Sequence, residues 1–138
     1  EAVVSPPLVG VRGDRAMALE QHFDYLKSIK GFLAAGIMQF TGELLASHTV
    51  TDSIDLGIAG ATFNDIFRSA HEVCTKIGLE AANELVLLTP KGIIVMLCTG
   101  VESKAHVHMI TVLAKDGNQA LAKMTMEKLA PAIVSDLA

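Results

Sequence analysis

The feature that most constrains the fold is a run of six consecutive apolar residues at positions 93–98. Successive side chains along a β-strand point to opposite faces, so a strand formed by this run would be apolar on both faces. Residues 85–88 repeat the pattern. Because a strand that is apolar on both faces must be covered on both faces, we expect a β-sheet enclosed between helices.

Turn-forming residues and hydrophobic periodicity divide the rest of the chain. Apolar residues at helical spacing predict a first helix that ends at Lys30, before Gly31. A last helix is expected at residues 119–137, with Asn118 as its N-cap and Pro131 inside it. Apolar runs between turn residues predict strands at residues 32–40, 43–48, 84–89, 93–99 and 105–114.

A long helix between the second and third strands is the best-defined element. Its N-cap is expected among Thr51, Asp52 and Ser53, and Gly78 follows its C-terminus. One face carries an apolar stripe that we expect to pack on the sheet, formed by Ala59, Phe63, Ile66, Phe67, Ala70, Val73, Cys74 and Ile77. The opposite face, expected in solvent, carries Asn64, Asp65, Arg68, Glu72 and Lys76.

The order of elements defines the fold class. Helix, two strands, helix, three strands and helix indicate an α/β protein of the α+β type. The close connections between strands read as hairpins, which predicts one mainly antiparallel five-stranded sheet between helices. We assign this domain to residues 17–138. Residues 1–16 lack a usable period and are expected to be a flexible N-terminal arm.

Composition excludes several functions. The net charge is −4 and the Lys and Arg residues are scattered, so the basic surface needed to bind nucleic acid is missing. The apolar runs are far shorter than the roughly 20 residues of a membrane-spanning helix. The hydrophobic fraction of 51%, with only 4% aromatic residues, suggests apolar surface buried against another chain. Cys74 and Cys98 fit buried free thiols in a reducing, cytoplasmic compartment, with a disulfide between them as the alternative.

Two histidines are the strongest candidates for chemistry. His106 and His108 are two residues apart on an expected strand, so both point to one face. They could begin a metal site if His71, Cys74 or Cys98 supplied a third ligand. The interpretation we favour is two histidines at a partly exposed face or interface. No phosphate-binding loop or nucleophile motif is present, so we expect no catalytic residue, no cofactor, no metal and no enzyme activity.

Several segments, taken in order, resemble the roadblock / dynein light chain family, in its bacterial or archaeal form. They are IKGFLAAGI at residues 29–37, GELLA at 42–46, TPKG at 89–92 and VLAKDGN at 112–118. The resemblance covers roughly residues 19–137 and implies a roadblock/profilin-like sandwich. The first hairpin departs from the family pattern, because Gln39-Phe40-Thr41-Gly42 lacks the acidic residue common there.

The resemblance implies a non-enzymatic homodimer that scaffolds or regulates, often beside a Ras-like small GTPase. The uncharged run at 85–88 would expose unpaired backbone groups at a sheet edge, and pairing with its own copy would satisfy them. We therefore expect a dimer interface of Leu85, Val86, Leu87, Leu88, Phe63 and Phe67. A surface for a small GTPase or another protein is expected at Asn64, Asp65, Arg68 and Glu72. The alternative function is a small-molecule sensor or carrier on a profilin-like sandwich.

Overall fold

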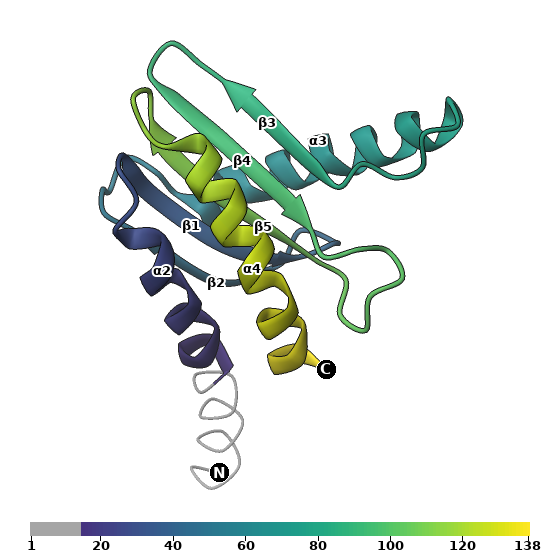
Figure 1. Ribbon diagram of the computed structural model, residues 1–138, viewed down its shortest axis with the longest axis horizontal. Coiled ribbons are helices and arrows are strands. Elements are labelled where there is room, and N and C mark those ends of the chain that lie inside the picture. Colours follow the sequence, from purple (N-terminus) through teal and green to yellow (C-terminus); the bar gives the residue numbers. More distant parts are fainter. Residues whose placement is uncertain (1–14) are drawn as a thin grey trace, which may run out of the picture.

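The computed structural model describes residues 15–138. A five-stranded antiparallel sheet in the order β2-β1-β5-β4-β3 forms its centre (Figure 1). The strands are β1 (Phe32–Gln39), β2 (Leu44–Thr49), β3 (Glu84–Leu88), β4 (Gly92–Cys98) and β5 (Val107–Ala114). The predicted sheet and fold class are thus confirmed. The expected arm lies outside the described residues, except for residues 15 and 16, which are helical.

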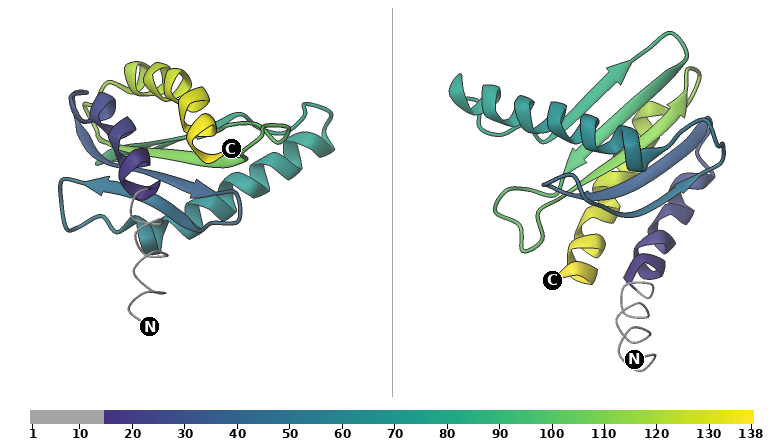
Figure 2. Two further views of the ribbon diagram at one scale, coloured as in Figure 1. Left: turned by 90° about the horizontal axis from the view of Figure 1, so that it is seen from below. Right: turned by 180° about the vertical axis from the view of Figure 1, so that it is seen from behind.

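Helices cover both faces of this sheet (Figure 2, left). The N-terminal helical segment comprises residues 15–20, the 3-10 turn η1 (Gln21–Phe23) and α2 (Asp24–Lys27). It lies beside α4 (Gln119–Leu137) on one face, and α3 (Leu56–Lys76) lies on the other. Among the described residues, none of the helices is both long enough and apolar enough to cross a lipid bilayer.

Two hydrophobic cores lie on the two faces. The larger core, under α4 and the N-terminal helical segment, includes Phe23, Ile37, Val95, Met109 and Met126. The smaller core, under α3, consists of Ala34, Met38, Leu56, Phe67, Met96 and Ile110. In β4, Val95 is 1% exposed and its neighbour Met96 is 0% exposed. The two-sided burial that the sequence predicted for this strand is confirmed.

Local signals explain most helix ends. The Asn118 side chain accepts a hydrogen bond from the Leu121 N–H, as predicted for the cap of α4. The cap of α3 is Asp55, whose carboxylate accepts hydrogen bonds from Gly57 and Ile58. The expected caps Thr51, Asp52 and Ser53 were therefore wrong, because the chain makes a further turn before the helix begins.

The face of α3 that packs on the sheet differs from the predicted one. Its buried residues are Leu56, Gly60, Asn64, Phe67 and His71. Of the predicted stripe, Phe67 is buried as expected, but Ile66 is 41% and Val73 is 52% exposed. Asn64 and His71, which have polar side chains, are both buried, and the Asn64 amide has hydrogen-bond partners in Phe40 and His108. The predicted burial of Ile66, Val73 and Ile77 and the predicted exposure of Asn64 were wrong.

Candidate functional site

An apolar row runs along the exposed flank of α3. It consists of residues spaced alternately by four and three, and we call it the α3 seam: Ala59, Phe63, Ile66, Ala70, Val73 and Ile77, the last of these being the C-cap. Ile66, Val73 and Ile77 are exposed, and the other members are half-buried. Alternating spacings of four and three are those of helices that pack against a second helix. Within the described residues, no second helix lies on this face of the sheet (Figure 2).

Strand β3 forms one edge of the sheet next to this seam. It pairs with β4 on one side, and its other side has no partner among the described strands. Leu85 and Leu87 lie opposite Met96 and Ile94, on the face that carries α3. Both leucines are half-buried, and Leu88 is 71% exposed. An edge that is apolar and uncharged over residues 85–88 readily accepts another strand.

The seam and the edge strand border one apolar region. Phe63 of the seam, Leu85 of β3 and Ile94 of β4 all pack around the smaller core while remaining partly exposed. Helix α3 packs chiefly on β1 and β2. The part of the sheet formed by β3 and β4 is therefore less covered on this face than on the face beneath α4.

The structure separates the expected interface residues into two groups. Leu85, Leu87, Leu88 and Phe63 retain exposed surface, whereas Val86 points to the other face and packs against the larger core. Phe67 is 0% exposed, so it cannot contact a partner unless the smaller core opens. Its expected place in the interface was wrong, because it occupies the buried rather than the outer track of α3.

The expected partner-binding residues also fall into an exposed group and a buried one. Asp65, Arg68 and Glu72 are exposed on the outer face of α3. Asn64 is 0% exposed, and its side-chain amide donates a hydrogen bond to the Phe40 carbonyl at 2.8 Å. Asn64 is therefore part of the interior, and its expected place on the outer face was wrong.

The fold brings four potential metal ligands together beneath α3. His71 of α3, Cys98 at the end of β4, His106 and His108 each have one ligand atom within 4.8 Å of the others. The prediction that His106 and His108 face the same side is confirmed by this grouping. His108 is 0% exposed, so the expectation that it lies on a partly exposed face was wrong.

The environment keeps these histidines neutral. Burial, together with the repulsion that a charged His108 would meet from His71, His106 and Arg68, lowers the pKa of His108 to about 3. Burial also lowers the pKa of His71 and of His106. It raises the pKa of the Cys98 thiol. Neutral imidazole is the form that binds metal ions.

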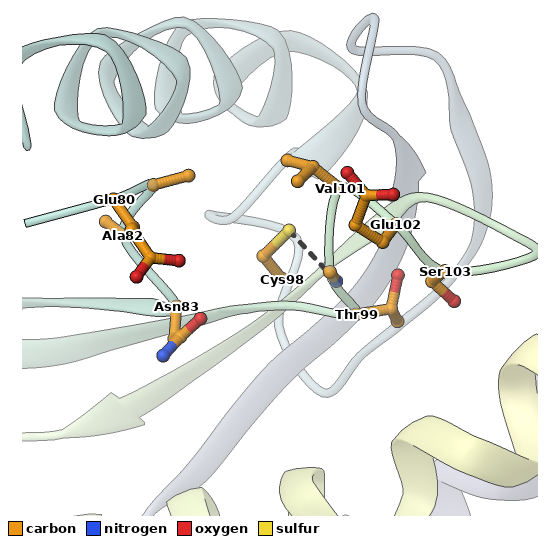
Figure 3. A pocket seen from close by; sticks show the side chains of 10 residues that line it. Glu80, Ala82, Asn83, Cys98, Thr99, Val101, Glu102 and Ser103 are labelled. Carbon is orange, nitrogen blue, oxygen red and sulfur yellow. Dashed lines mark hydrogen bonds between the residues drawn. The ribbon is translucent and has the colours of Figure 1, made fainter. Parts of the chain in front are cut away.

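A surface pocket of about 310 Å³ lies next to Cys98 (Figure 3). Residues 80–83 and 98–103 line it, and all of them belong to the loop before β3, the end of β4 or the loop that follows β4. Cys98 and Cys74 are both free thiols. The disulfide that the sequence left open is therefore not formed.

The sequence matches no known family model, and no curated protein is recognisably similar to it. Solved structures, however, share its fold. MglB of Myxococcus xanthus matches with a TM-score of 0.73 at 11% identity, over 91% of this chain and 89% of that chain. An MglB with a tetrameric arrangement matches with a TM-score of 0.72 at 13% identity, over 90% of this chain and 88% of that one.

A roadblock/LC7 domain from Streptomyces avermitilis is similar as well. Its TM-score is 0.71 at 10% identity, over 83% of this chain and 92% of that chain. The chain thus has the roadblock/LC7 fold, as the sequence motifs predicted. At such low identity, the likeness establishes the fold alone.

Proposed function

We propose that this protein is a non-enzymatic, cytoplasmic scaffold or regulator that works as a symmetric homodimer. The observation that carries the proposal is the α3 seam, a helix-pairing pattern that is exposed beside an unpaired strand edge. A second copy of the chain offers the matching seam and the matching edge. One partner can cover both the α3 seam and the edge of β3, and a second copy of the chain is the simplest such partner.

The geometry of such a dimer follows from two-fold symmetry. Strand β3 pairs antiparallel with its copy, which satisfies the free backbone groups of both edges and joins the two sheets. The two α3 helices lie on the same face of the joined sheet, with Ile66 and Val73 of each seam against the other helix. Leu85 and Leu87 are then covered by the pair of helices.

A solved structure with the same fold supports self-association. One of the similar structures is an MglB with a tetrameric arrangement. That MglB therefore assembles with copies of itself. In the proposed dimer, the outer faces of both α3 helices stay accessible. Asp65, Arg68 and Glu72 would form the surface for a third protein, and a Ras-like small GTPase is the partner class that the roadblock resemblance implies.

Sedimentation velocity of a Leu87→Lys variant tests the strand pairing. A lysine in β3 places two like charges at the two-fold interface and should convert the dimer to a monomer. Val50→Lys is the matched control, because Val50 is 58% exposed and follows β2 at the opposite edge of the sheet. A wild-type monomer at micromolar concentration would contradict the proposal, as would a dimer that Leu87→Lys leaves intact.

A further inference from the structure

The cluster under α3 contains polar atoms that its protein neighbours do not satisfy. The Nε2 of His71 lies 3.3 Å from the Nε2 of His108. The Nδ1 of His71 and the Nε2 of His106 are buried and have no hydrogen-bond partner among the described residues. Buried polar atoms without a partner are rare and costly. The unpartnered Nε2 of His106, beside the paired Nε2 atoms of His71 and His108, therefore points to a missing ligand.

A hydrogen bond from His108 to Asn64 fixes which nitrogen of His108 faces the cluster. The Asn64 amide NH₂ donates to the Phe40 carbonyl, so its oxygen is the atom that lies 2.6 Å from His108 Nδ1. That oxygen only accepts, which means that Nδ1 of His108 carries the proton. The Nε2 of neutral His108 is then unprotonated and directed at His71. Histidine ligands of metals usually have an outer partner of this kind, which orients the ring.

We propose that His71, Cys98, His106 and His108 bind one zinc ion in a tetrahedral site. Two imidazole nitrogens on a tetrahedral zinc lie about 3.3 Å apart, and a thiolate sulfur lies about 3.6 Å from each nitrogen. The observed distance between the His71 and His108 nitrogens already has this value. His106 and Cys98 are half-buried beside the loop that follows β4, where small shifts bring them into place.

The donor set suits zinc better than a hard cation. Imidazole and thiolate are the ligands that zinc prefers, whereas magnesium and calcium take oxygen. On binding, the Cys98 thiol gives its proton to water and a zinc–sulfur bond forms, so the bound ion and thiolate together add one positive charge. The Gly100 N–H donates to the Cys98 sulfur at 3.3 Å (Figure 3) and stabilises the thiolate.

Four protein ligands leave zinc no open position, so the role of the site is structural. His71 belongs to the last two turns of α3, and the other three ligands belong to β4, β5 and the loop between them. Zinc would therefore fasten the C-terminal part of α3 to the sheet. None of the four ligands belongs to the α3 seam, so the zinc site and the proposed dimer can be tested separately.

Zinc binding by the full-length chain in reducing buffer tests the proposal. The protein is incubated with zinc sulfate, freed of excess metal by gel filtration and analysed for zinc by mass spectrometry. We expect one zinc per chain. Cobalt(II) in place of zinc should give the visible bands of a tetrahedral site and a thiolate charge-transfer band in the near ultraviolet.

Matched variants show which side chains bind. Cys98→Ser and His106→Gln should each weaken zinc binding by about 100-fold or more, since losing even an outer partner costs about 10–100-fold. Cys74→Ser and His48→Gln are the controls, because Cys74 and His48 are also half-buried but lie outside the cluster. Circular dichroism checks that all four variants are folded.

Three outcomes would overturn the site. One is less than stoichiometric zinc in the folded wild-type protein. Another is equal binding by the ligand variants and the controls. The third is a cobalt spectrum without the thiolate band, which would exclude Cys98 as a ligand.

Discussion

Asn64 of α3 and His108 of β5 are joined by a buried hydrogen bond of 2.6 Å, although 44 residues separate them in the chain. This contact links the long helix to the centre of the sheet. It also explains why a polar residue lies on the buried face of α3. The α3 seam is exposed because a different face of the helix packs on the sheet. That face consists of Leu56, Gly60, Asn64, Phe67 and His71.

Replacing Asn64 by leucine should destabilise the protein although leucine is more hydrophobic. The variant leaves the His108 Nδ1–H and the Phe40 carbonyl without their partner, and each unsatisfied group costs about 1–3 kcal/mol. We expect Asn64→Leu to lower the free energy of unfolding by about 2–6 kcal/mol in urea denaturation. Asp65→Leu, at the exposed neighbouring position, should change it by less than about 0.5 kcal/mol. Equal losses of unfolding free energy in the two variants would show that the Asn64 hydrogen bonds do not stabilise the fold.

Phe67 should be a core residue and not a dimer contact. It is fully buried between the helix and the sheet and packs against the rings of His71 and His108. Phe67→Ala is expected to cost about 3–5 kcal/mol in thermal or urea unfolding. Tyr25→Ala is the control, because Tyr25 is 66% exposed. A loss below about 1 kcal/mol for Phe67→Ala would contradict its assignment to the core.

Two glycines allow steric crowding to be separated from backbone strain. Gly31 and Gly78 both have positive φ, of 84° and 86°. A Cβ on Gly31 would lie 2.6 Å from the Cα of Gly117, whereas a Cβ on Gly78 would have no atom within 4 Å. Gly78→Ala should cost about 1–2 kcal/mol from the left-handed conformation alone. Gly31→Ala should cost about 1–3 kcal/mol more, because overpacking adds to that strain. Similar losses in urea unfolding would contradict the close approach of Gly31 and Gly117.

Removing zinc should loosen the C-terminal part of α3. If the ion fastens His71 to the sheet, chelation of the zinc-loaded protein should speed hydrogen exchange of the amides that follow His71 in α3. Amides in α4, on the opposite face, should not change. Exchange that is the same before and after chelation would show that zinc does not hold the helix.

Much of the fold could be predicted from local signals. Gly78 and Asn118 were assigned to helix ends from residue type, and each has the backbone or cap geometry expected of it. The predicted end of the first helix at Lys30 was wrong, because α2 ends at Lys27 and the chain turns before Gly31. The pairing of β3 with β4 followed from the turn between them. Such features depend on neighbouring residues, and a single sequence contains that information.

The buried face of α3 could not be assigned in the same way. Polarity indicated that Asn64 lies outside, but its partners come from Phe40 and His108, which are far away in the sequence. The spacing of His106 and His108 gave their common face, yet it could not show whether His71 or Cys98 joins them. That depends on the path of α3 across the sheet, which no local pattern defines.

The central claim is that the α3 seam is the contact surface of a homodimer. Sedimentation equilibrium of Val73→Glu, with Ser69→Glu as control, tests it most directly. Both residues are exposed on α3, but Val73 belongs to the seam and Ser69 does not. We predict a dimer for the wild-type chain and for Ser69→Glu, and a folded monomer for Val73→Glu. A wild-type monomer, or a Val73→Glu dimer as tight as the wild type, would contradict the account.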